Sequence, residues 1–118
     1  MHDSLEELRQ QLRRFAQARD WEQFHTPKNL SMALIAEAAE LIEHFQWLTA
    51  KESEALPPAR REAVAQEMAD VLIYLVRMAD RLGVDLIAAA ARKMAANEER
   101  YPASKVRSDA RRAGEYPA

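Results

Sequence analysis

The sequence predicts an all-α protein, and three observations support this fold class. Alanine accounts for 23 of the 118 residues, whereas glycine occurs twice and cysteine is absent. Alanine is the strongest helix former, and the β-branched residues that favour strands are few. Apolar residues also recur at helical spacing in four stretches joined by short connections. We therefore expect a subunit of the four-helix bundle type.

Two helices are expected in the N-terminal half. The first opens at Ser4, because Glu7 three residues later matches the pattern of a capping box. The segment 21–28 breaks the helical period and contains Pro27, so we expect a loop there. The second helix then runs from about residue 29 to residue 48 along a stripe of leucines and Phe45.

Two further helices are expected in the C-terminal half. Two adjacent prolines end a charged linker and precede a third helix over residues 59–82, which Gly83 can end as a C-cap. Asp85 can cap a fourth helix that continues to about Glu99. We expect residues 1–102 to form one helical domain and residues 103–118 to form a flexible basic tail.

The third helix is apolar around most of its circumference. Its main stripe carries valine, leucine and methionine, and Ile73 and Val76 lie on another face. One small subunit can hardly cover so much apolar surface. The pattern therefore predicts a homo-oligomer in which helices pack across a symmetry axis.

The composition and charge exclude several classes of function. Without cysteine there is no disulfide framework, zinc finger, iron–sulfur cluster or thiol nucleophile. The chain shows no apolar run of about 18 residues and no apolar block of a signal peptide, so we expect a cytoplasmic protein without a membrane partner. No basic face suits a nucleic-acid polymer. Residues 29–56 hold five acids and one base, which points to cations instead.

The two central helices each carry two carboxylates one turn apart, Glu37 with Glu40 and Glu67 with Asp70. Like charges at this spacing repel, and near a core they are costly unless a cation neutralises them. Carboxylate oxygens are the ligands of hard cations such as magnesium, manganese or calcium. The alternative is that these acids form ordinary solvated faces with surface ion pairs, and the residues alone leave both interpretations open.

Three further groups of residues could bind a ligand. On the fourth helix, Lys93, Asn97 and Arg100 share one stripe that could hold phosphate oxygens or could simply face solvent. Trp21 and Trp47 could stack on a base or pack in the core. At 100° per residue, Trp47 would share the stripe of Glu37 and Glu40. A lone loop histidine such as His25 is usually exposed.

Several short motifs follow one another along the chain. They begin with DWEQFH at residues 20–25 and EAAEL at residues 37–41, with FQW at 45–47. They continue with EMADVLIYL at residues 67–75 and with Lys93-x3-Asn97-x2-Arg100-Tyr101-Pro102. In this combination they resemble the dCTP pyrophosphatase branch of the MazG-like, all-α NTP pyrophosphohydrolases. The resemblance covers about residues 15–102, and the combination of motifs is specific for the branch.

The resemblance implies an enzyme that cuts a nucleoside triphosphate between its α and β phosphates, with magnesium as cofactor and manganese as a possible substitute. It implies that the metal is held by Glu37, Glu40, Glu67 and Asp70. It also implies a set of residues that bind the substrate: Trp21, His25, Trp47, Tyr74, Lys93, Asn97, Arg100 and Tyr101. Relatives of this kind assemble as tetramers, dimers of dimers. The alternatives are a broad-specificity or dUTP-type pyrophosphatase and a non-enzymatic helical oligomer that binds nucleotides.

Overall fold

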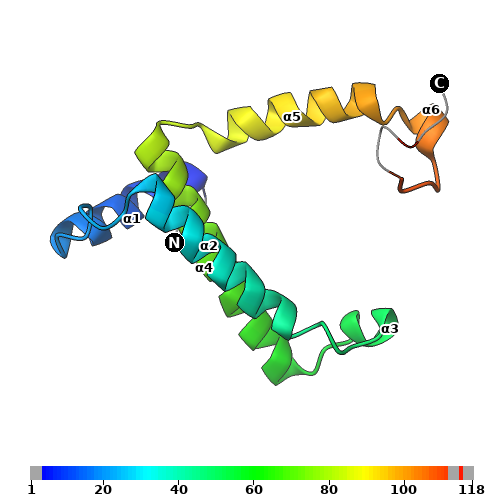
Figure 1. The fold of residues 1–118 in the computed structure, drawn as a ribbon, viewed down its shortest axis with the longest axis horizontal. Coiled ribbons are helices and arrows are strands. Elements are labelled where there is room, and N and C mark those ends of the chain that lie inside the picture. Colours follow the sequence, from blue (N-terminus) through cyan, green and yellow to red (C-terminus); the bar gives the residue numbers. More distant parts are fainter. Residues whose placement is uncertain (1–3, 112–114, 116–118) are drawn as a thin grey trace. The chain divides into compact units, whose positions relative to one another are not determined.

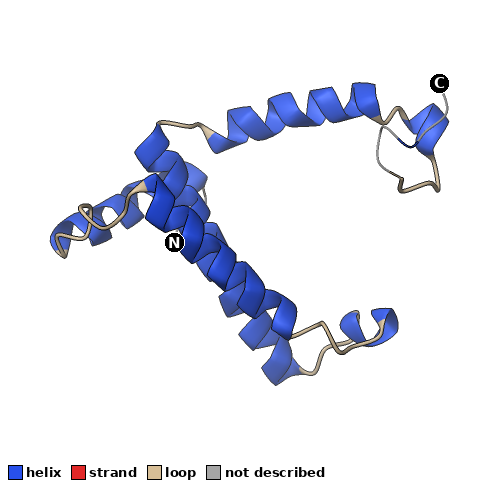
Figure 2. Ribbon diagram, in the orientation of Figure 1, coloured by secondary structure: helices blue, strands red, loops and turns tan. Residues whose placement is uncertain are grey.

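The computed structural model describes residues 4–111 and Glu115, and over this part of the chain it contains helices and no strands (Figure 2). The all-α prediction is therefore confirmed. The chain divides into two compact units, residues 1–84 and residues 85–118. Each unit is described by itself below.

The first unit is built on an antiparallel helix pair. It contains α1 (Leu5–Ala18), α2 (Pro27–Glu43), α3 (Ala50–Ser53) and α4 (Pro58–Leu82). Helices α2 and α4 lie side by side and run in opposite directions, and α1 contacts α4 (Figure 1). The buried apolar side chains come from all three of these longer helices: Ala16, Leu30, Val64, Val76 and Ala79.

The helix boundaries follow local capping chemistry. The Ser4 hydroxyl accepts a hydrogen bond from the backbone N–H of Glu7, as the sequence predicts for the start of α1. Gly83 ends α4 with φ 67°, a left-handed conformation that glycine adopts without strain. Asp85 accepts a hydrogen bond from the N–H of Ala88 and so caps the next helix, as predicted.

The predicted helix over residues 29–48 is wrong at both ends. Helix α2 begins earlier because Thr26 caps it and Pro27 fits the first turn, where its missing N–H costs nothing. The helix ends at Glu43, and residues 44–47 form turns. Thr49 and Glu52 then form a capping box that starts α3, which the sequence analysis did not predict. The predicted loop 21–28 accordingly shortens to residues 21–26.

The second unit contains α5 (Leu86–Arg100) and α6 (Ala103–Val106). The fourth predicted helix is thus confirmed to within a residue. The one-turn helix α6 lies within the segment expected to be a loose tail. Part of that tail, residues 112–114 and 116–118, lies outside the described residues, and the domain boundary at residue 102 stays a prediction.

Large apolar side chains remain exposed along the central helix pair. They are Met32, Ile35 and Ile42 on α2, and Met68, Leu72 and Leu75 on α4. Their exposure agrees with the apolar circumference of the third predicted helix. Within the described part of the chain, no helix combines the length and the apolar character needed to span a membrane.

Candidate active site

The central helix pair brings carboxylates from both helices together. Glu37 on α2 and Glu67 and Asp70 on α4 each offer a carboxylate oxygen, and these three oxygens lie within 4.8 Å of one another. We call these three residues the acidic cluster. The i, i+3 spacing puts Glu67 and Asp70 on one face of α4, and the antiparallel packing carries Glu37 opposite them.

The pKa values of this site reflect burial and mutual repulsion. Burial raises the pKa of Glu37 to about 7, and a hydrogen-bonding contact with Glu40 and the charge of Asp70 act in the same direction. The pKa of Glu67 is also raised, first by burial and then by Glu40. Glu40 therefore belongs to the same carboxylate neighbourhood, although its own side chain is exposed. Glu43 is exposed as well and lies outside the acidic cluster.

Two oxygens of the acidic cluster are buried without a hydrogen-bond partner among the described residues. They are Oε2 of Glu37 and Oε2 of Glu67. A buried, unpartnered carboxylate oxygen is costly unless a proton or a cation satisfies it. The donor set consists of hard oxygens on rigid helices, which suits a hard divalent cation such as Mg²⁺. The residues present therefore fit the metal that the resemblance implies.

Trp21 and His25 lie together in the loop between α1 and α2. The Trp21 ring makes an edge contact with Phe15, with centroids 5.8 Å apart, and lies 6.2 Å from the His25 ring. Trp21 is 43% exposed, so one part of its ring packs on α1 while the rest faces outward. His25 is half-buried, which differs from the exposed position expected for a loop histidine.

Trp47 does not lie on the carboxylate stripe of α2, because that helix ends at Glu43 and Trp47 occupies the following turn. At 87% exposure, it does not pack in the core of this chain. The structure therefore rejects the core-packing interpretation for Trp47 and leaves its indole available for a ligand or a second chain. Tyr74 is half-buried on α4, one turn beyond Asp70.

The remaining predicted substrate residues belong to the second unit. Lys93 and Arg100 are exposed on α5, and Asn97 is half-buried between them. The Arg100 guanidinium lies over the Tyr101 ring, 5.6 Å from its centroid. The i, i+4, i+7 spacing on a continuous helix places Lys93, Asn97 and Arg100 on one face, as expected.

An ion-pair network that the sequence does not predict lies toward the C-terminal end of α4. The side chain of Arg77 on α4 is only 3% exposed, and it pairs with Asp80 at 3.1 Å. Asp80 also binds Arg9 and Arg13 from α1. The i, i+4 spacing of the two arginines on α1 is visible in the sequence, but the contact across 67 residues or more is not.

Comparison with known proteins identifies the family. The model of the MazG-like family matches residues 33–115. The human protein named dCTP pyrophosphatase 1 is 47% identical over 116 residues, which is 97% of this chain and 68% of the human protein. The mouse protein of the same name is 48% identical over 91% of this chain and 64% of its own length. The chain thus spans about two thirds of these relatives.

A solved structure supports the same assignment. A pyrophosphatase from Archaeoglobus fulgidus has a TM-score of 0.79 and 43% sequence identity, and the match covers 86% of this chain and 95% of that one. The family model and the mammalian relatives together cover every motif on which the resemblance was based. The chain therefore belongs to the MazG-like family.

Proposed function

We propose that this protein is a magnesium-dependent pyrophosphohydrolase that converts dCTP, or a dCTP with a modified base, to the nucleoside monophosphate and pyrophosphate. The observation that carries the proposal is the pair of buried, unpartnered carboxylate oxygens on Glu37 and Glu67, within a cluster completed by Asp70. The names of the mammalian relatives support the choice of dCTP.

Glu37, Glu40, Glu67 and Asp70 are the residues that would hold the metal. Bound there, Mg²⁺ supplies a positive charge that offsets the charge of the triphosphate and polarises its phosphoryl oxygens. The exposed Glu40 stands beside the acidic cluster, so the carboxylate neighbourhood reaches from the buried oxygens to solvent. An open side is what a site needs in order to admit a substrate as well as a cation.

The proposed reaction is hydrolysis at the α-phosphorus, with a separate role for each group of residues. A water molecule attacks the α-phosphorus, the bond between that phosphorus and the bridging oxygen of the β-phosphate breaks, and pyrophosphate leaves. The proton of the attacking water passes to a carboxylate, either Glu37 or Glu40. The resemblance assigns the phosphates to residues of the second unit: Lys93 and Arg100 would stabilise the charge that develops on the leaving pyrophosphate, together with Asn97 and Tyr101.

The base is bound by aromatic side chains contributed by more than one subunit. Trp21 and His25 precede α2 and Trp47 follows it, and the 17 residues of this helix separate them by about 25 Å. Trp47 of a neighbouring chain would therefore complete the pocket with Trp21, His25 and Tyr74, and hydrogen bonds within it distinguish cytosine from other bases. The exposure of Trp47 in the single chain supports this role, because a stacking surface must be free before substrate binds.

The active form is a homo-oligomer, and we propose a tetramer in the cytoplasm that acts on free nucleotides and does not bind a nucleic-acid polymer. The exposed Ile35, Met68 and Leu72 on the central helix pair support the assembly, since each is at least 40% exposed in the single chain. Light scattering on the purified protein should give four times the chain mass of 13.5 kDa. A monomer at micromolar concentration would contradict it.

The proposed activity is tested by hydrolysis of a nucleotide panel with Mg²⁺, following both pyrophosphate and phosphate. We expect dCTP and 5-substituted dCTP to be cleaved fastest, with pyrophosphate as the inorganic product. Equal rates on all deoxynucleotides would favour a broad-specificity pyrophosphatase, and fastest cleavage of dUTP would favour that specificity. Calorimetric binding of dCTP without turnover would favour a non-enzymatic nucleotide-binding oligomer.

A further inference from the structure

Arg77 lies inside the first unit and joins the His25 loop to α4. Its Nε donates a hydrogen bond to Nδ1 of His25 at 3.3 Å, and its Nη1 donates to Asp80 at 3.1 Å. Its Nη2 is 3.7 Å from the carboxylate of Glu22. The guanidinium is planar, so these contacts fix its orientation as well as its position.

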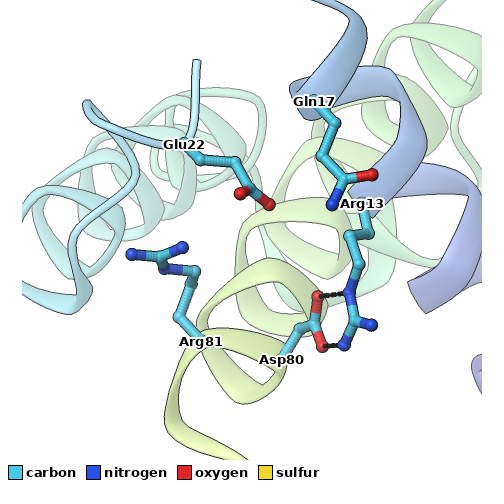
Figure 3. Close-up of a pocket in the computed structure, with 5 residues that line it drawn as sticks. All are labelled: Arg13, Gln17, Glu22, Asp80 and Arg81. Atoms are coloured by element: carbon cyan, nitrogen blue, oxygen red, sulfur yellow. Dashed lines mark hydrogen bonds and ion pairs between the residues drawn. The ribbon is translucent and has the colours of Figure 1, made fainter. Parts of the chain in front are cut away.

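Asp80 anchors Arg77 to α1. Its carboxylate is 4% exposed and accepts hydrogen bonds from Arg9 at 2.6 Å and from Nε of Arg13 at 3.0 Å. Figure 3 shows Arg13 and Asp80 paired through two hydrogen bonds at one side of a pocket of about 270 Å³. Glu22 and Arg81 extend into the same pocket from the loop and from the end of α4 (Figure 3).

The contact with Arg77 determines where His25 carries its proton. Arginine has only donors, so Nδ1 of His25 must accept the hydrogen bond and cannot itself be protonated. A neutral imidazole then has its proton on Nε2. Protonation of Nδ1 would break the hydrogen bond and place two cations side by side.

The charges around His25 favour the same state. Burial lowers the pKa of His25 most, and the cations Arg77 and Arg81 on α4 lower it further, whereas Glu22 in the loop opposes them. His25 is therefore neutral at physiological pH. The Trp21 ring packs on another side of the imidazole and limits its rotation.

We propose that Arg77 is a positioning residue, which holds His25 as the neutral imidazole with its proton on Nε2 so that this N–H donates to the base or sugar of the substrate. The role of His25 toward substrate rests on the proposed function. The part played by Arg77 rests on its own contacts. Arg77 lies seven residues beyond Asp70, or about 10 Å along the helix axis, so it is not part of the acidic cluster.

The tautomer is measured directly by long-range ¹H–¹⁵N correlation spectra of the full-length protein at pH 7.5. The signals of His25 are identified by their loss in His25→Gln. In the wild type we expect Nε2 of His25 to be protonated. In Arg77→Met we expect a mixture of both tautomers of His25 and a higher pKa of its imidazole. Arg81→Met is the matched control, because Arg81 is a cation near His25 that makes no hydrogen bond to it in the described structure. The Arg81→Met substitution should raise the pKa of His25 and leave its tautomer unchanged.

Steady-state kinetics then test the link to substrate. Arg77→Met should raise KM for dCTP about twofold, because in an even mixture of tautomers only half of the molecules carry the Nε2 proton, and it should leave kcat unchanged. Arg77→Lys keeps the charge but not the planar donor, so it should restore the low pKa of His25 and not the single tautomer.

The outcomes separate the two proposals. A wild-type His25 protonated on Nδ1, or a single unchanged tautomer in Arg77→Met, would overturn the positioning role whether or not the protein hydrolyses dCTP. If the tautomer changes while KM does not, the proposed hydrogen bond to substrate is wrong. A protein without dCTP hydrolysis but with the expected tautomer would overturn the proposed function and not the Arg77–His25 contact. The wild-type spectrum alone decides if Arg77→Met does not fold.

Discussion

Glu37 on α2 and Glu67 on α4 each bury one carboxylate oxygen that has no hydrogen-bond partner in the described structure, and both side chains belong to the acidic cluster. Two such oxygens cost stability unless something positive or a proton satisfies them. We propose that the helix pair is arranged for a cation as well as for packing. This relationship is the basis for the first prediction.

Glu67→Gln should lower the turnover of dCTP at least about 100-fold, because it removes a ligand of the proposed metal. It should also remove the thermal stabilisation by Mg²⁺, which for wild type amounts to about 2.7 kcal/mol at 100 times the dissociation constant. Thermal unfolding with and without Mg²⁺ measures this stabilisation, and the rate of dCTP hydrolysis measures the loss of turnover. Glu43→Gln, an exposed acid outside the cluster, is the control and should behave as wild type. A Glu67→Gln protein that Mg²⁺ still stabilises would rule out Glu67 as a ligand.

Asp80→Asn should destabilise the fold by about 3 kcal/mol, because it leaves the buried Arg77 without its carboxylate partner. Asp109→Asn is a matched control, since Asp109 also pairs with an arginine but lies at the surface. Its effect should stay below about 1 kcal/mol. Urea unfolding of both variants at pH 7 gives the comparison. Equal effects would show that burial of the Asp80 pair contributes nothing.

The lowered pKa of Asp80 predicts how the free energy of unfolding changes in acid. Hydrogen bonds from Arg13 and Arg9 lower the pKa of Asp80 from 3.8 to about 2. A group whose pKa is lower in the folded state stabilises the fold above its unfolded pKa. The stabilisation of the fold by ionised Asp80 is therefore lost as the pH falls from about 4 through about 2. Unfolding free energies measured across this range should fall less steeply for Asp80→Asn than for wild type, and parallel curves would contradict the assignment.

Trp47→Ala should leave the unfolding free energy of the chain nearly unchanged, because the side chain is 87% exposed. If the indole stacks on the base, the substitution should raise KM for dCTP between about fivefold and 100-fold, corresponding to about 1–3 kcal/mol. Trp47→Phe keeps a stacking surface and should recover most of the affinity. An unchanged KM in Trp47→Ala would exclude Trp47 from the base pocket.

The sequence predicted those parts of the structure that local chemistry determines. Ser4 and Asp85 begin helices because their side chains accept hydrogen bonds from backbone N–H groups of the first turn, and Gly83 ends a helix because it adopts a left-handed conformation. Each of these signals lies within four residues of the helix end. The spacing of Glu67 and Asp70 likewise fixed their common face. Only the resemblance implied that Glu37 shares a site with them, and the packing of α2 on α4 agrees with it.

Other features depend on contacts that no local pattern shows. The end of α2 at Glu43 carries no glycine or proline, so the apolar period seemed to continue to Leu48. The position of Trp47 was misjudged for the same reason. The burial of Arg77 involves His25 from the loop, and its neighbour Asp80 is bound by Arg9 from α1; both of these contacts span more than 50 residues.

The central claim is that water attacks the α-phosphorus of dCTP, and hydrolysis in ¹⁸O-labelled water tests it most directly. The account predicts one ¹⁸O atom in the dCMP product, unlabelled pyrophosphate, and loss of both products in Glu67→Gln. Label in the pyrophosphate would place the attack on the β-phosphorus. Release of labelled inorganic phosphate, or no turnover with Mg²⁺, would contradict the account.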